Sequence, residues 1–119
     1  MDMPLPDQSI LSRKAEIVAR LQSVLPKNAV IHAESEVRAY ECDALSAYRC
    51  PPLCAVLPAS TEEVAAALRV CHEMGVPVVP RGSGTSLAGG ALPTADCVIL
   101  GVARLNGVLE TNYDDRYIR

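Results

Sequence analysis

The clearest fold signals lie in residues 54–90, which read CAVLPASTEEVAAALRVCHEMGVPVVPRGSGTSLAGG. Within it, residues 54–58 and 76–80 are short apolar runs that end in proline, which is typical of buried strands. Between the two runs, Ser60 and Glu63 have the spacing of a capping box at the start of a helix. Strand, capped helix and strand in this order predict a β-α-β unit with parallel strands and a right-handed crossover.

The helix inside this unit has predictable limits and a predictable buried face. Gly75 occupies the position after the last turn, where a left-handed residue is favoured. Apolar residues recur at helical spacing along one side, and these should face the core: Val64, Ala67, Leu68 and Cys71.

Upstream, residues 9–25 are predicted to form one amphipathic helix, which Pro26 ends. Residue Ser35 is a plausible N-cap of a short helix, and residues 41–53 give mixed signals that predict irregular structure. Downstream, residues 97–102 predict a third strand. Asn106-Gly107 predicts a turn, followed by extended segments at residues 108–111 and 116–119.

These elements indicate an α+β fold of α/β-like character, with an N-terminal helix, a β-α-β unit and further strands. We expect a helical and irregular segment over residues 1–52 and the first part of a larger, truncated domain over residues 53–119. Half of the residues are apolar, which is enough for a core.

Composition excludes some classes of partner. The chain has four Tyr, no Phe and no Trp, and its formal net charge is −3. Single-stranded nucleic acid binding usually relies on aromatic stacking, and any nucleic acid needs a basic footprint, so no nucleic acid is expected. No apolar run approaches the ~18 residues of a membrane span. The N-terminus lacks the features of a signal peptide, which favours a cytoplasmic protein.

The five cysteines are an odd number without a C-x-x-C pair, so reduced thiols are expected and disulfides are not. The alternative is a metal site built from Cys42, Cys50, Cys54 and the Cys71-His72 pair. The spacing matches no common zinc or iron–sulfur pattern, and buried free cysteine is common. We expect no metal site, and structural roles for His32 and His72.

Residues 80–90 hold four of the seven glycines and follow directly on a predicted strand. Ligands of open α/β sheets bind outside such strand ends. Glycine admits positive φ angles and lets a ligand approach the backbone, where successive amides form an anion-binding nest. Arg81 adds a positive charge beside these amides, and hydroxyls come from Ser83, Thr85 and Ser86. The segment therefore predicts a phosphate or pyrophosphate site.

Two common phosphate motifs do not fit. An NTPase P-loop needs a lysine after its last glycine, and Ala91 stands there. The dinucleotide fingerprint G-x-G-x-x-G needs a glycine where Leu87 stands, and Pro93 interrupts the helix that should follow. From the residues alone, a glycine-rich loop that only turns a corner stays open as the alternative.

Residues 57–64, residues 78–86 and the Gly89-Gly90 pair resemble the opening of the FAD-binding domain of the vanillyl-alcohol oxidase/PCMH superfamily. Within it, they resemble the FAD-linked subunit of bacterial glycolate oxidase together with D-lactate and D-2-hydroxyglutarate dehydrogenases. Asp43-Ala44-Leu45 and Leu105-Asn106-Gly107-Val108 extend the resemblance along nearly the whole chain.

The resemblance implies the first subdomain of a PCMH-type FAD-binding domain, in which FAD lies between two α+β subdomains. The glycine segment would surround the pyrophosphate, two later glycines would permit close approach, and a proline would lie near the cofactor pocket. The cofactor-binding residues implied in this way are Arg81, Gly82, Ser83, Gly84, Thr85, Ser86, Gly89, Gly90 and Pro58. Thr85 stands where some members carry a histidine that tethers FAD, so non-covalent FAD is expected.

The resemblance also implies the activity of a full-length parent: a flavoprotein oxidoreductase, dehydrogenase or oxidase, that passes a hydride from a small 2-hydroxy acid to FAD. Partner subunits with an iron–sulfur component are implied, which can hold a cytoplasmic enzyme at the inner membrane. No catalytic or metal residue is expected among residues 1–119, and the fragment alone should be inactive and poorly soluble. A stand-alone anion- or nucleotide-binding module and an inactive truncated product remain as alternatives.

Overall fold

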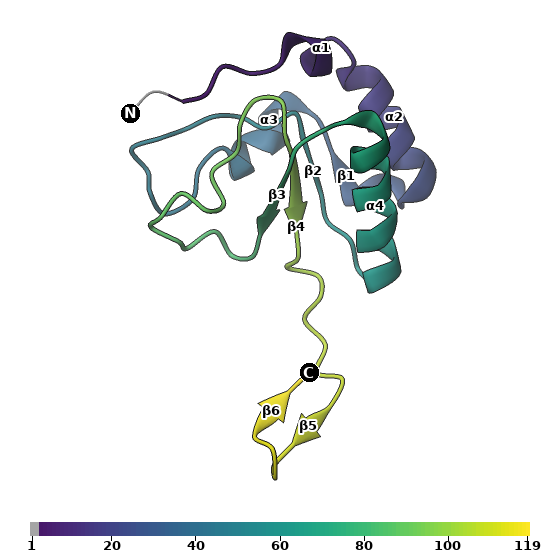
Figure 1. The fold of residues 1–119 in the computed structure, drawn as a ribbon, viewed down its shortest axis with the longest axis vertical. Helices are drawn as coiled ribbons and strands as arrows, with labels where there is room; N and C mark the ends of the chain where they lie inside the picture. Colours follow the sequence, from purple (N-terminus) through teal and green to yellow (C-terminus); the bar gives the residue numbers. More distant parts are fainter. Residues whose placement is uncertain (1–2) are drawn as a thin grey trace.

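The computed structural model describes residues 3–119 and confirms the α+β fold (Figure 1). Its centre is a four-stranded mixed sheet with the strand order β1-β2-β4-β3. The strands are β1 (Val30–Ile31), β2 (Cys54–Val56), β3 (Val78–Arg81) and β4 (Val98–Gly101). Strand β4 is parallel to both β2 and β3, and β1 is antiparallel to β2. The predicted β-α-β unit is present, with β4 inserted between its two strands.

Helix α4 (Thr61–Met74) joins β2 to β3 and begins as the capping motif predicts. The Ser60 hydroxyl accepts from the Glu63 N–H at 3.2 Å, while the Glu63 carboxylate accepts from the Ala59 N–H at 2.7 Å. Gly75 ends the helix with a φ of 66°. The predicted buried face needs one correction: Leu68 is 42% exposed and Val70 is buried, because the covered face is centred on Ala67 and Cys71.

The single helix predicted over residues 9–25 was wrong, because the chain forms α1 (Gln8–Leu11) and α2 (Lys14–Val24). The break lies at residues 12–13, whose side chains turn back: the Ser12 hydroxyl and the Arg13 Nε both donate to the Ser9 carbonyl, at 3.0 and 3.1 Å. Such bonds compete with the regular helical pattern and bend the chain. A second Arg13 nitrogen donates to the Met74 carbonyl at 3.2 Å, which ties the break to the end of α4.

Helices α2 and α4 lie side by side against the sheet (Figure 1) and enclose the main core. Ile17 and Leu21 of α2 are fully buried, as are Val56 of β2 and Val98 of β4. Both the first 52 residues and the later part of the chain contribute to this core. At its surface, Arg20 of α2 pairs with Glu73 of α4 at 3.1 Å.

Short elements connect α2 to β2. The 3-10 turn η1 (Lys27–Ala29) leads into β1, and α3 (Glu34–Val37) runs into the 3-10 turn η2 (Arg38–Tyr40). The N-cap of α3 is Ala33, so the prediction that Ser35 caps this helix was wrong. Residues 41–53 contain no helix or strand, as predicted.

After β4 the chain leaves the body in an extended path and ends in a small hairpin (Figure 1). The hairpin strands are β5 (Thr111–Asn112) and β6 (Tyr117–Ile118). The predicted turn at Asn106-Gly107 was wrong: the chain turns earlier, where the Leu105 N–H donates to the Val102 carbonyl at 3.0 Å. We call residues 102–119 the C-terminal arm. Its apolar side chains are largely uncovered, among them Leu109 at 78% and Ile118 at 69%.

Candidate functional site

The glycine loop, residues 82–90, starts where β3 ends, at the carboxyl edge of the three parallel strands. The Val102 N–H donates to the Arg81 carbonyl at 2.9 Å, which fixes the start of the loop against the end of β4. All residues of the loop except Gly84 and Gly89 are exposed, and those two are half-buried. The loop therefore presents its backbone to solvent at the sheet edge where ligands of such folds bind.

The first six backbone donors of the loop are unpaired among the described residues. No hydrogen bond joins the N–H groups of residues 82–87 to any other residue between 3 and 119. The loop contacts that do exist are local: the Ala88 N–H donates to the Ser86 hydroxyl at 3.2 Å, and the Ser83 and Thr85 hydroxyls lie 3.4 Å apart. Six consecutive unpaired amides with hydroxyls beside them are suited to an anion with several oxygens.

The glycines of the loop serve two different needs. Gly84 and Gly89 have φ angles of +73° and +75°, which side-chain-bearing residues rarely adopt. Gly82 and Gly90 have no such angle, and a Cβ at either position would meet nothing within 4 Å. The packing of this chain does not require glycine at 82 and 90, so the open space leaves room for a ligand close to the backbone.

Arg81 was expected to offer its charge to an anion, but the structure turns its side chain toward the segment before β2. The Arg81 Nη1 donates to the Cys42 carbonyl at 2.7 Å. The guanidinium carbon lies 5.8 Å from the centre of the Tyr40 ring, within range of a cation–π contact. The positive charge of Arg81 thus lies between the glycine loop and residues 40–42, which we call the inner side of the loop.

The Tyr40–Leu45 segment forms a second wall next to the loop. Leu45 Cδ2 lies 3.8 Å from the position that a Cβ of Gly89 would take. Asp43 is only 5% exposed; its Oδ1 accepts from the Leu45 N–H at 2.9 Å, while its Oδ2 is buried and pairs with none of the described residues. A hollow of about 310 Å³ between this wall and the loop is lined by Leu45, Tyr48 and Gly89, among others. The sequence patterns had not marked Asp43 as buried.

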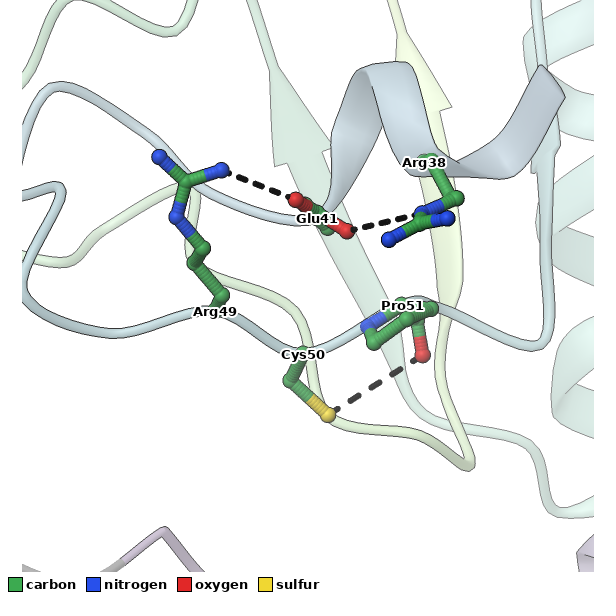
Figure 2. Close-up of polar contacts among 5 residues, drawn as sticks. All are labelled: Arg38, Glu41, Arg49, Cys50 and Pro51. Carbon is green, nitrogen blue, oxygen red and sulfur yellow. Dashed lines mark hydrogen bonds and ion pairs between the residues drawn. The ribbon is translucent and has the colours of Figure 1, made fainter. Parts of the chain in front are cut away.

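The wall is braced by ion pairs that Figure 2 shows. The Glu41 carboxylate receives Arg49 Nη1 at 3.0 Å and Arg38 Nε at 3.7 Å. The Cys50 N–H donates to the Glu41 carbonyl at 2.8 Å, and the Cys50 thiol lies 3.9 Å from the Pro51 carbonyl oxygen. These contacts hold Glu41 next to Arg49 and Cys50, so the irregular segment between them forms a closed loop.

Pro58 follows β2 at the same sheet edge, and its side chain is fully buried. The carbonyl of the preceding Leu57 accepts from Arg104 at 3.2 Å. A separate hollow of about 500 Å³ lies beyond it, between the first turn of α4 and the arm, with Ser60, Glu62 and Arg104 in its lining.

The cysteines and histidines lie outside the glycine loop. All five thiols are free, and burial raises the pKa of Cys54 to about 12 and those of Cys71 and Cys97 to about 11, so these three stay protonated. Three or more potential metal ligands do not gather anywhere between residues 3 and 119. His32 and His72 are exposed. Across the same residues, no helix is long and apolar enough to cross a membrane.

Residues 52–119 match a protein family described as "FAD binding domain". The glycolate oxidase subunit GlcD of Escherichia coli (strain K12) is 44% identical over 112 residues, which are 94% of this chain and 22% of that protein. The mitochondrial D-2-hydroxyglutarate dehydrogenase of Bos taurus is 36% identical over 77% of this chain and 17% of its own length. The chain thus spans less than a quarter of these relatives.

Solved structures share the fold. The 4-ethylphenol oxidase from Gulosibacter chungangensis superimposes with a TM-score of 0.81 at 26% identity, over 97% of this chain and 23% of that one. An alkyldihydroxyacetonephosphate synthase superimposes with a TM-score of 0.74 at 21% identity, over 96% of this chain and 24% of that one.

Proposed function

This chain belongs to the FAD-binding domain family of PCMH type, in the group of the glycolate oxidase subunit GlcD and D-lactate dehydrogenase, and from that premise we propose that its glycine loop binds the FAD pyrophosphate. The observation that carries the proposal is the run of free backbone N–H groups at residues 82–87. Fixed amide donors stabilise a doubly charged group without reorganising. The open space at Gly82 and Gly90 fits the close approach of such a group.

Each residue of the site has a role in this proposal. The backbone of residues 82–86 surrounds the pyrophosphate, and the Ser83, Thr85 and Ser86 hydroxyls add donors. Gly84 gives the loop its left-handed turn, and Gly89 and Gly90 leave room for the rest of the cofactor. Arg81 contributes positive charge from the inner side of the loop, and the buried Pro58 shapes the neighbouring edge at the end of β2.

The bound flavin would supply the hydride acceptor for a full-length parent enzyme. We propose that this parent is a dehydrogenase or oxidase of a small 2-hydroxy acid, as the names of the relatives suggest. In this proposal the residues of this chain bind and orient the cofactor. We assign no acid, base or metal ligand among residues 3–119, and we expect the chain alone to be inactive. The parent works with partner subunits, one of them an iron–sulfur protein, in the cytoplasm or at the inner membrane through them.

The test is an NMR titration of the 119-residue chain with pyrophosphate, ADP and FAD. The amide signals of residues 82–87 should shift with each ligand, and those of the first turn of α4 should not. Gly82→Ala should weaken binding, because its Cβ occupies the open face of the loop. The control is Gly107→Ala, another exposed glycine whose Cβ would meet nothing within 4 Å. Shifts confined to residues 60–62, or none at all, would refute the assignment of the loop.

FAD is held without a covalent bond, because Thr85 cannot form the bond that a histidine forms at the comparable place in some relatives. Acid precipitation of the flavin-loaded full-length protein should leave a colourless pellet and a yellow supernatant. A pellet that stays yellow after washing in denaturant would contradict this.

A further inference from the structure

We propose that the Arg81 side chain is a positioning group: it sets the shape of the glycine loop by clamping it to the Tyr40–Leu45 wall, and it does not itself bind phosphate. The inference rests on the function proposed for the loop. It departs from the simplest expectation for an arginine at the start of a phosphate loop, which is direct contact with the anion.

The guanidinium is held on two sides by the wall. Its Nη1 donates to the Cys42 carbonyl at 2.7 Å, and its Cζ lies over the Tyr40 ring, 5.8 Å from the ring centre. A hydrogen bond from a charged group to a partly buried carbonyl is stronger than one between neutral groups. Together the two contacts direct the charge away from the open face of the loop.

The loop in turn passes close to this side chain at Gly84. A Cβ at Gly84 would overlap the Cζ and Nη2 atoms of Arg81, so a larger residue there would push the guanidinium out of its present place. Gly89 has nearly the same φ angle but only an ordinary contact with Leu45 at 3.8 Å. Two features therefore favour glycine at position 84: its φ of +73° and the Arg81 guanidinium next to its Cα.

The wall that Arg81 contacts is held by interactions of its own. Glu41, between Tyr40 and Cys42, is paired with Arg49 and Arg38, and its carbonyl accepts from the Cys50 N–H. Through its contacts with Cys42 and Tyr40, the Arg81 side chain thus links the position of the loop to that of the wall. A loop ordered before its ligand arrives loses less conformational entropy on binding.

A double-mutant cycle tests the clamp in the 119-residue chain, with Arg81→Lys, Tyr40→Leu and the double variant. Lysine keeps the charge but has no planar fork to bond Cys42 and stack on the ring together. We expect each single variant to shift the amide signals of residues 82–87 in the ligand-free protein and to weaken pyrophosphate binding by about tenfold. The double variant should bind no more than about twofold worse than Arg81→Lys, because both changes break the same clamp.

Tyr40→Phe is the matched control, because it keeps the ring and the Tyr40 hydroxyl makes no hydrogen bond among the described residues. This variant should bind pyrophosphate as the unsubstituted chain does. If Tyr40→Leu leaves the ligand-free loop signals and the affinity unchanged while Arg81→Lys weakens binding, Arg81 binds the anion directly and the clamp is refuted. If the unsubstituted chain binds no pyrophosphate at the loop, the proposed function fails, and the ligand-free signals still decide the clamp. Thermal unfolding of every variant separates either outcome from loss of the fold.

Discussion

Replacing Gly84 by alanine should cost far more stability than the same change at Gly89, although the two glycines have almost the same backbone angle. Their φ values are +73° and +75°. A left-handed alanine costs about 1–2 kcal/mol, of which ~0.4–1 kcal/mol is offset by the reduced entropy of the unfolded chain. Gly89→Ala should therefore lower the free energy of unfolding by about 0.5–1 kcal/mol, because its only close neighbour is Leu45 Cδ2 at 3.8 Å.

Gly84→Ala pays the same backbone cost and also displaces Arg81, whose guanidinium occupies the place of the new Cβ. Loss of the bond to the Cys42 carbonyl costs about 1–2 kcal/mol, and loss of the contact with the Tyr40 ring about 0.5–1 kcal/mol. The total is about 2–4 kcal/mol, so the two alanine variants should differ by ~1.5–3 kcal/mol.

Urea denaturation followed by circular dichroism measures both free energies of unfolding, provided that the m-values of the two variants agree. The internal check is Gly84→Ala combined with Arg81→Ala, which removes the overlap: its loss should be less than the sum of the two single losses. Equal losses for Gly84→Ala and Gly89→Ala would refute the reasoning, because the backbone angle would then account for the whole effect and Arg81 would not pass behind Gly84.

Three further predictions follow from the contacts described above. Ser60→Ala removes the acceptor of the Glu63 N–H and should lower the free energy of unfolding by about 1 kcal/mol in urea denaturation, whereas Ser60→Thr should recover most of it. Burial raises the pKa of Cys54 from 9.0 to about 12, so the unfolded state loses this proton first. The stability that this thiol contributes should be full below pH 9 and fall as the pH rises toward 12. Cys54→Ala should make the pH slope in thermal melts smaller, and part of the slope that is left belongs to Cys71 and Cys97, whose pKa values are raised to about 11. The uncovered Leu109 and Ile118 should make the chain self-associate, so replacing both by glutamate should reduce the mass measured by light scattering to that of a monomer; an unsubstituted chain that is already monodisperse and monomeric would contradict this.

Local signals in the sequence determined much of this protein. The capping box at Ser60, the left-handed Gly75 and the short apolar runs define helix α4 and its flanking strands, because each depends on hydrogen bonds or φ angles within a few residues. The glycine loop could likewise be placed after β3 from composition alone, and the residues around it carried the resemblance to FAD-binding domains. The roles of Arg81 to Ser86, Gly89, Gly90 and Pro58 remain predictions.

Which distant segments meet depends on packing between residues far apart in the chain. Strand β4 lies between β2 and β3 because strand order depends on packing across the sheet, which no local pattern encodes. The break between α1 and α2 depends on Arg13 reaching Met74 at the far end of α4, and the direction of Arg81 depends on Tyr40 and Cys42, about 40 residues earlier in the chain. The sequence determined that a glycine-rich segment follows β3, and it predicted an anion site there. The fold left the N–H groups of residues 82–87 unpaired and placed the Arg81 guanidinium between the loop and the Tyr40–Leu45 wall, because the Cys42 carbonyl and the Tyr40 ring hold it there.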